Sequence, residues 1–208
     1  EPQLKAMEEL DMVLAVHGEV VDPAVDIFDR ESVFLSEQLA PILERFPRLR
    51  VVLEHVSTAD AVRFVESAGA QCAATITPHH LLLNRNDLLV GGVKPHHYCL
   101  PIVKTRHDQD VLISAATSGN SQFFLGTDSA PHAKNRKESA CGCAGIYSAF
   151  AAIEYYAEVF SQHDAMERLN DFASVFGARF YGLELNQTSV LLERREWVVP
   201  ERIAYGDN

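Results

Sequence analysis

The chain has 208 residues, 47% of them hydrophobic and 23% charged, which is enough for one globular domain with a sizeable core. Its formal net charge of −11 argues against nucleic acid as a partner, because phosphate binding needs a basic face. No apolar run approaches the roughly 18 residues of a membrane-spanning helix, so we expect no membrane association.

The cysteines indicate a reducing compartment. Cys72, Cys99, Cys141 and Cys143 match no secreted disulfide pattern, and no signal peptide opens the chain, so we expect reduced thiols in a cytoplasmic protein. Cys141 and Cys143 could instead form half of a zinc site, although no second close pair accompanies them. Residues 4–10 already have helical spacing, so we expect further residues to precede this chain.

Strand-like and helix-like segments alternate along the chain. The apolar patterns predict strands at 12–17, 51–55, 72–76 and 122–127, and helices at 29–45, 59–67, 106–117, 145–160 and 163–176. Ser57 is the predicted cap of the helix at 59–67, and Gly69 ends it. Residues 79–105 are predicted to be a long irregular segment, which suggests a functional loop. The tail from 186 onward contains a strand-like stretch at 190–192 and no other clear element.

Strand-helix alternation predicts an α/β fold with a parallel sheet. Four strand-helix units are about half of a (β/α)8 TIM barrel, which needs eight and typically about 250 residues. The predicted organisation is therefore a single incomplete domain, residues 1–208, that forms the C-terminal half of a barrel. A small doubly wound sheet is the alternative, but no Gly-rich phosphate loop follows the first strand.

Three predicted strands end in residues that bind metals or move protons. His17 and His55 each follow a run of aliphatic residues, and Asp128 follows the fourth strand. Catalytic groups of barrel enzymes lie at such strand ends, and zinc favours histidine nitrogen and carboxylate oxygen. A single histidine there is most often structural, and Asp128 could cap a turn, a role that Ser129 could take instead. The pattern leaves a metal site and these structural roles open.

Other polar residues give weaker signals. His132 lies in the loop after the fourth strand and could be a solvated histidine or part of the same rim. The pairs at 79–80 and 96–97 are not predicted ligands, because neighbours in an extended chain point in opposite directions. The basic run at 134–137 is interpreted as a solvated loop, with an anion site as the alternative.

Longer motifs carry a resemblance to a known family. Residues 16–19 (VHGE), 54–55 (EH), 74–80 (ATITPHH), 84–86 (NRN), 90–95 (VGGVKP), 98–101 (YCLP), 124–132 (FLGTDSAPH) and 137–145 (KESACGCAG) resemble dihydroorotases of the bacterial and yeast-like class in the amidohydrolase superfamily. The resemblance extends over about residues 12 to 185. These motifs are long enough to be specific.

The resemblance implies a metal-dependent hydrolase with two Zn²⁺ ions in a complete (β/α)8 barrel. By motif, His17 and His55 would bind one zinc, while Asp128 would bind the other and act as general base and acid. Leu100 and Ala144 would contact the substrate through backbone groups, and His132 would pair with the substrate carboxylate.

The implied reaction is the reversible conversion of L-dihydroorotate and water into N-carbamoyl-L-aspartate, a step of pyrimidine biosynthesis with zinc-bound hydroxide as nucleophile. The family's His-x-His pair, its bridging carboxylated lysine and its substrate-binding arginine and asparagine have no counterpart here, so we expect them upstream, in a missing N-terminal half. A homodimer is also expected. The alternatives are a non-catalytic half-barrel scaffold and a related hydantoinase or allantoinase.

Overall fold

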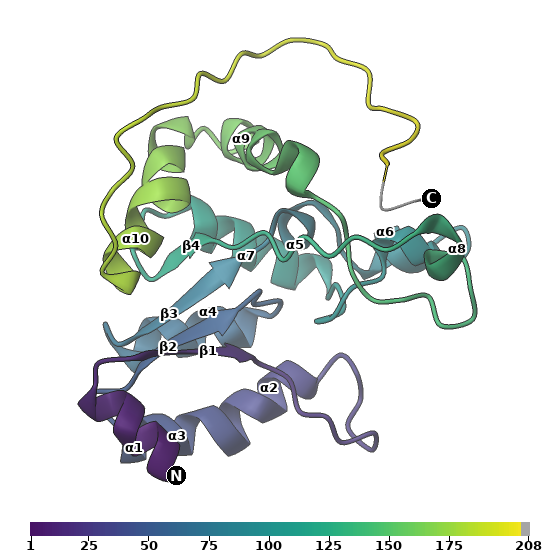
Figure 1. Ribbon diagram of the computed structural model, residues 1–208. Coiled ribbons are helices and arrows are strands. Elements are labelled where there is room, and N and C mark those ends of the chain that lie inside the picture. Colours follow the sequence, from purple (N-terminus) through teal and green to yellow (C-terminus); the bar gives the residue numbers. More distant parts are fainter. Residues whose placement is uncertain (205–208) are drawn as a thin grey trace.

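Four short parallel strands form one sheet in the computed structural model, which describes residues 1–204 (Figure 1). They are β1 (Val13–His17), β2 (Arg50–Glu54), β3 (Cys72–Ile76) and β4 (Phe123–Leu125). All four lie within one or two residues of the predicted strands. The register pairs Val16 with Leu53 and Ala74 with Phe123, so the carboxyl ends of the strands lie along one edge region of the sheet.

The strand order distinguishes between the two predicted architectures. Its order, β1-β2-β3-β4, is sequential and all neighbours are parallel. A doubly wound sheet reverses its order at a switch point, whereas a barrel adds each strand beside the previous one. The sheet is open among the described residues, with β1 and β4 at its edges. This confirms the prediction of consecutive strand-helix units that make up about half of a barrel.

Helices connect the strands and surround the sheet. Their bounds are α1 (Pro2–Glu9), α2 (Arg30–Phe34), η1 (Leu35–Leu39), α3 (Ala40–Arg45), α4 (Ala59–Ala68), α5 (Pro78–Leu82), α6 (Arg85–Leu89), η2 (Pro95–His97), α7 (Arg106–Thr117), α8 (Lys134–Lys137), η3 (Ala149–Ala151), α9 (Ala152–Gln162), η4 (Met166–Arg168), η5 (Asp171–Val175) and α10 (Phe176–Tyr181). The predicted helix at 29–45 is therefore one continuous segment of α2, η1 and α3.

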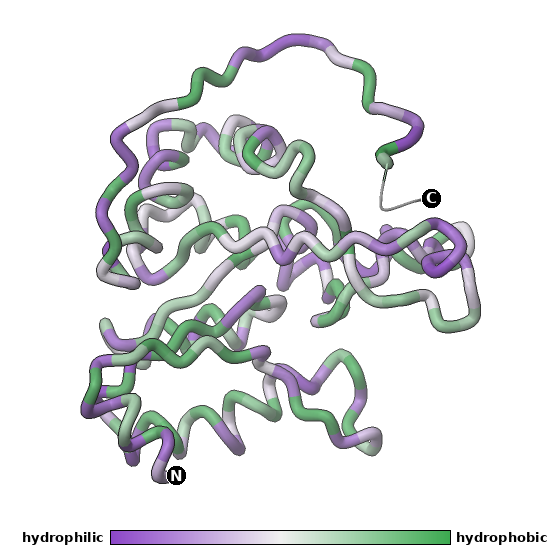
Figure 2. Tube along the Cα trace, viewed as in Figure 1, coloured by the Kyte–Doolittle hydropathy of each residue, from purple (hydrophilic) through white to green (hydrophobic). Residues whose placement is uncertain are grey.

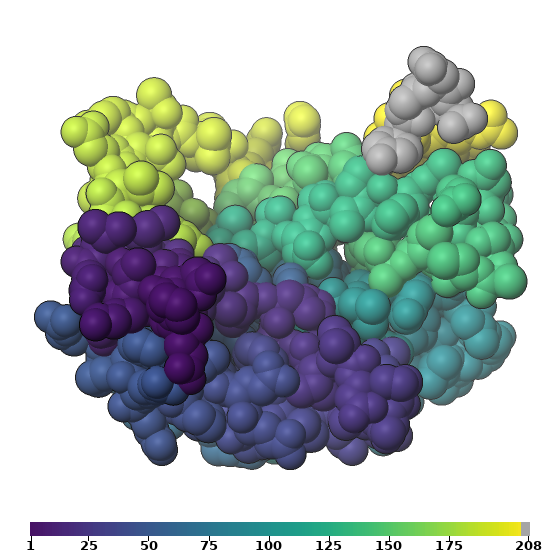
Figure 3. Space-filling model, turned by 60° about the horizontal axis from the view of Figure 1, so that its bottom comes forward, coloured from purple at the N-terminus to yellow at the C-terminus, as the bar shows by residue number. Residues whose placement is uncertain are grey.

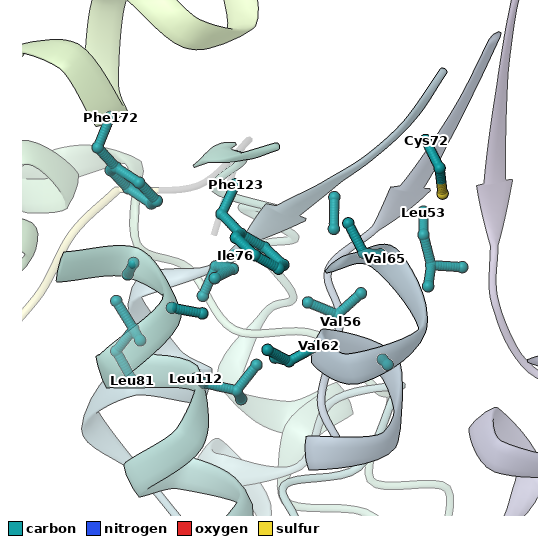
Figure 4. Packing of buried hydrophobic residues seen from close by; sticks show 14 of the residues in the cluster. Leu53, Val56, Val62, Val65, Cys72, Ile76, Leu81, Leu112, Phe123 and Phe172 are labelled. Carbon is teal, nitrogen blue, oxygen red and sulfur yellow. The ribbon is translucent and has the colours of Figure 1, made fainter. Parts of the chain in front are cut away.

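Side chains along each strand alternate between the two faces of the sheet, and the two faces are covered by different elements. Leu53, Ile76 and Phe123 point to the face covered by α4 and α7, where they form the main hydrophobic core (Figure 4). Val52 and Phe124 point to the opposite face, and there the cluster with Phe176 of α10 is small. In a barrel this second face would point inward.

The residues after α1 and the end of α10 meet near the amino end of β2. Figure 3 shows the purple first residues beside the yellow-green region near residue 180. Arg50 connects them, since its guanidinium donates to the carbonyl of Phe180 at 2.8 Å and pairs with the carboxylate of Asp11 at 3.1 Å. The end of α10 is thereby held at the amino end of β2.

Some local predictions were wrong. Thr58, rather than Ser57, caps α4, because the Thr58 hydroxyl accepts from the N–H of Ala61. The segment at 79–105 is not wholly irregular: Thr77 caps α5, and Asn84 caps α6 through a capping box with Asp87. These caps satisfy N–H groups at helix starts, and this stabilises even one-turn helices.

The tail also differs from its prediction. Residues 190–192 form no strand, and no helix or strand is found between residues 183 and 204. Figure 2 shows this tail as an arc with alternating hydrophilic and hydrophobic residues, well separated from the green apolar strands. Within residues 1–204, none of the helices has the length and apolar character to cross a bilayer.

Candidate metal and substrate site at the strand ends

His17 and His55 come together at the carboxyl ends of β1 and β2. Nδ1 of His17 lies 3.2 Å from Nε2 of His55, and the ring centroids are 4.8 Å apart with nearly edge-to-face geometry. The parallel register explains the approach, since His17 pairs with Glu54 and His55 follows directly. Two positions 38 residues apart in sequence thus present two imidazole nitrogens to one point.

This geometry fits a zinc ligand pair. Two nitrogens at about 2.0–2.1 Å from a tetrahedral zinc ion lie about 3.3 Å apart. The observed separation of 3.2 Å is close to that value. Nδ1 of His55 is buried and has no hydrogen-bond partner among the described residues, so nothing else in this part of the chain determines its tautomer. The donor set and spacing therefore fit a zinc ion held by one nitrogen of each ring.

Glu19 sets the protonation of His17. Its buried carboxylate accepts from Nε2 of His17 at 3.1 Å, which in the neutral ring leaves the lone pair on Nδ1, the nitrogen that faces His55. This is the carboxylate–histidine arrangement that orients metal ligands. The hydrogen bond to Glu19 raises the pKa of His17, while burial, and next the positive charge that His17 carries when protonated, lower the pKa of His55 to about 4. His55 is therefore neutral at neutral pH, as metal binding requires.

Thr75 of β3 holds the backbone at the end of β2. Its hydroxyl accepts from the N–H of His55 at 2.7 Å and donates to the carboxylate of Glu54 at 2.6 Å. His55 has a φ of 43°, and Asp128, which follows β4, has a φ of 41°. Left-handed conformations in non-glycine residues cost energy and are concentrated at functional sites. Both predicted site residues after β2 and β4 carry this strain.

Asp128 caps no turn in the described part of the chain, where its carboxylate accepts no hydrogen bond. Ser129 instead accepts from the N–H groups of Ser148 and Ala149 at 3.0 and 2.9 Å. Burial raises the pKa of Asp128, the charge of His17 lowers it, and Glu54 raises it further. These charges act on Asp128 from the ends of β1 and β2, which indicates that the three strand ends face a common space.

Another group of potential ligands is buried nearby. His79, His80 and Cys99 place their ligand atoms within 4.8 Å of one another, and within residues 1–204 they are the one such set of three. The extended conformation assumed for residues 79–80 was wrong, because both lie in α5. However, both nitrogens of His80 are engaged, with Thr77 at 2.8 Å and with the carbonyl of Pro101 at 2.9 Å. A metal there would have to break these bonds.

The predicted substrate residues lie on two neighbouring loops. Nε2 of His132 donates to the carbonyl of Ala144 at 3.0 Å, so these two residues are in direct contact. The N–H of Gly145 donates to the carbonyl of Tyr98 at 3.0 Å, which brings Ala144 close to the segment containing Leu100. In the described part of the chain the N–H groups of Leu100 and Ala144 donate no hydrogen bond to protein. Both donors are thus free to bind a ligand.

The basic run at 134–137 and the cysteines Cys141 and Cys143 lie in the loop region after β4. Lys134 is exposed as predicted, but Lys137 is buried, so the interpretation of the whole run as solvated was wrong. The thiols of Cys141 and Cys143 lie 3.7 Å apart, and within residues 1–204 no third ligand joins them in a metal-binding group.

Sequence reasoning missed Glu19, Thr75 and Lys137 as parts of the site. A signal existed for Glu19, because side chains two residues apart in extended chain point to the same side, and it follows His17 by two. Lys137 left no such signal, since its partners are backbone carbonyls, which every residue has.

Curated relatives match the chain along its length. It is 58% identical over 207 residues to a dihydroorotase of Nitrosococcus oceani, a match that covers 100% of this chain and 60% of that protein. It is 61% identical over 202 residues to a dihydroorotase of Idiomarina loihiensis, covering 97% of this chain and 59% of that protein. The chain therefore spans about 60% of the length of the curated relatives it matches. No family model matches it.

Solved dihydroorotase structures also resemble this chain. A dihydroorotase from Saccharomyces cerevisiae in complex with 5-fluoroorotic acid aligns with a TM-score of 0.81 and 36% identity, covering 88% of this chain and 53% of that one. A dihydroorotase from Campylobacter jejuni aligns with a TM-score of 0.80 and 36% identity, covering 88% and 51%. A D-hydantoinase from a Thermus species, at 20% identity and a TM-score of 0.75, shares the fold.

Proposed function

Because this chain belongs to the dihydroorotase family and spans about 60% of the length of its relatives, we propose that it forms the C-terminal half of the catalytic barrel of a zinc-dependent cyclic amide hydrolase. The proposed reaction interconverts L-dihydroorotate and water with N-carbamoyl-L-aspartate, in pyrimidine biosynthesis. The chain would be one incomplete domain, and the remaining strands, with the bridging carboxylated lysine and further zinc ligands, would come from residues outside it.

The 3.2 Å approach of Nδ1 of His17 to Nε2 of His55 carries this proposal. Together with the Glu19 carboxylate behind His17, it supports a zinc site that is prepared before the metal arrives. The second zinc would take Asp128 as its ligand from this chain. Within residues 1–204 Asp128 belongs to no close set of three potential ligands. This is compatible with the proposed role, because the other ligands of the second zinc would come from residues outside this chain.

Asp128 would move the proton. Zinc bound at this site would lower the pKa of a bound water and polarise the carbonyl of the scissile amide. Asp128 would take a proton from the attacking water and deliver it to the departing ring nitrogen, and in the cyclising direction it would run the same transfers in reverse.

The substrate would be held by groups on the loops above the sheet. The free N–H groups of Leu100 and Ala144 can donate to an anionic ligand. With Nε2 of His132 donating to Ala144, a substrate carboxylate would bind at Nδ1 in the imidazolium form of the ring. These local donors and the zinc ions would attract an anion into a chain whose net charge is −11.

The proposal is tested with the full-length protein that contains this chain. Zinc content is measured on the purified protein, and the hydrolysis of dihydroorotate and of hydantoin is compared under the same conditions. We expect two zinc ions per site and turnover of dihydroorotate only. Bound zinc with turnover of hydantoin alone would indicate a hydantoinase, and absence of both zinc and turnover would indicate a scaffold. The homodimeric state and the cytoplasmic location stay predictions.

A further inference from the structure

A buried lysine lies directly beside the proposed substrate loop and plays no part in the mechanism so far. Lys137 is the last residue of α8, and only 3% of its surface is exposed. Its ammonium donates to the carbonyls of Tyr98, Cys143 and Gly145 at 2.8, 2.7 and 2.9 Å. All three N–H donors are thus used, and within residues 1–204 Lys137 forms no salt bridge with a carboxylate.

A buried ammonium without a carboxylate is costly unless its hydrogen bonds are complete. The three carbonyls belong to two segments that are far apart in sequence, one around Tyr98 and the other at 143–145. Lys137 therefore joins the loop that contains Leu100 to the loop that contains Ala144. A second contact joins the same segments, because the N–H of Gly145 also donates to the carbonyl of Tyr98.

The three carbonyls also determine which way Ala144 faces. The carbonyl of Cys143 and the N–H of Ala144 belong to one planar trans peptide unit, so they point in opposite directions. Since Lys137 holds that carbonyl, the N–H of Ala144 points away from Lys137. In the next peptide unit the N–H of Gly145 points to Tyr98, so the carbonyl of Ala144 points the other way, to His132. Both polar groups of Ala144 therefore face the side on which His132 lies.

This loop is packed against the strand end that carries Asp128. The N–H of Ala130 donates to the carbonyl of Ile146 at 3.0 Å. Gly145 has a φ of 147°, and a Cβ there would lie 2.6 Å from the carbonyl oxygen of Ala130, so only glycine allows this approach. The loop that contains Ala144 is thus held in close contact with Ala130, two residues after Asp128.

We propose that Lys137 is a positioning residue for substrate binding, whose ammonium aims the N–H of Ala144 at the substrate and holds the Leu100 loop beside it. The inference rests on the proposed function. Lys137 itself touches neither substrate nor metal in this account. It acts through the peptide carbonyls, which makes its effect one on substrate affinity rather than on the proton transfer at Asp128.

The test compares Lys137→Met with Lys134→Met in the full-length, zinc-loaded protein. Lys134 lies on the same helix with a side chain that is 79% exposed, so it controls for loss of a lysine from α8. We expect Lys137→Met to raise the KM for dihydroorotate about 10-fold or more, the size expected for loss of one hydrogen bond to a charged group. Its kcat should change little and its zinc content should stay that of wild type, while Lys134→Met should change none of these.

A second variant covers the case in which Lys137→Met does not fold. Lys137→Gln keeps two N–H donors and should give a KM between those of wild type and the methionine variant. A wild-type KM in whichever variant folds would overturn the inference, as would a loss of kcat and zinc with KM unchanged. A wild-type protein that does not hydrolyse dihydroorotate would refute the proposed function instead, which keeps the two failures distinct.

Discussion

Replacing Glu19 with glutamine tests whether the hydrogen bond between Glu19 and His17 orients His17 for zinc binding. Glu19→Gln keeps the size and shape of the side chain but replaces a carboxylate acceptor by a neutral amide oxygen. The hydrogen bond from Nε2 of His17, 3.1 Å long in the wild-type chain, then becomes a neutral one. We expect weaker zinc binding, because the ring is held less firmly in the tautomer that offers Nδ1 to the metal.

The magnitude follows from the burial of this pair. The Glu19 side chain is 4% exposed, so its hydrogen bond is not weakened by water. A hydrogen bond to a charged group contributes about 1.5–3 kcal/mol and a neutral one about 0.5–1.5 kcal/mol. The difference of roughly 1–1.5 kcal/mol corresponds to about a 10-fold rise in the Kd for zinc.

The assay is a competition for zinc between the full-length protein and a chelator at about pH 8, where histidine side chains are largely neutral. The pH matters because Glu19 raises the pKa of His17, so the wild-type ring takes up a second proton more readily than the ring in the variant, and zinc competes with that proton. In Glu19→Gln the pKa of His17 is not raised in this way. At lower pH protons would therefore compete less with zinc in the variant than in wild type, and this would hide part of the loss in zinc affinity.

Glu138→Gln is the matched control. Glu138 also accepts from a histidine, Nε2 of His96 at 3.0 Å, but both side chains are about half exposed and belong to no predicted ligand set. We expect no change in zinc affinity for this variant. Equal zinc affinity for Glu19→Gln and wild type, with an unchanged Tm, would refute the view that Glu19 orients a zinc ligand.

Further predictions concern Asp128, Tyr156 and the chain by itself. Asp128→Asn in the full-length protein should lower kcat by at least about 100-fold because it removes the proton shuttle, and a kcat near that of wild type would contradict the assignment. Tyr156→Phe should lower the free energy of unfolding by about 1–3 kcal/mol in a denaturant titration, because the buried hydroxyl donates to the carbonyl of Ile76 at 2.6 Å, and a loss well below this range would show that the bond contributes little. The isolated 208-residue chain should bind less than one equivalent of zinc and show no appreciable turnover of dihydroorotate, since catalytic zinc usually needs three protein ligands and this chain offers His17 and His55 for one ion; full activity of the isolated chain would disprove this.

The sheet was predictable because its signal is local. Each strand is a short, mainly apolar run, and apolar side chains are needed on both faces of a buried parallel sheet. The predicted limits match those of β3 and differ by one residue from those of β2. The helix around α2 and α3 was also predicted, because its apolar residues recur at helical spacing along one face.

The short helices of the long loop were not predicted, because their stability comes from caps rather than from periodicity. α5 and α6 have five residues each, too few to show a helical repeat. Thr77 and Asn84 do carry the capping signal. The same kind of ambiguity misplaced the cap of α4, where Ser57 and Thr58 are adjacent and only the three-dimensional structure shows that Ser57 pairs with Glu31 and Lys104 instead.

For the candidate site, the sequence predicted residues that the structure places at the strand ends, but it did not predict the residues that contact them. His17, His55 and Asp128 stand out because each follows an apolar run. The parts played by Thr75 and Lys137 depend on a neighbouring strand and on backbone carbonyls of distant loops, contacts that exist only once the chain has folded.

The central claim is that this chain contributes half of a dihydroorotase active site, with His17 and His55 on one zinc ion. Its most direct test is a structure of the full-length protein at a wavelength that locates zinc by anomalous scattering. We expect a zinc peak between Nδ1 of His17 and Nε2 of His55, with a second peak at Asp128. A zinc-loaded protein without a peak between these two nitrogens would contradict it.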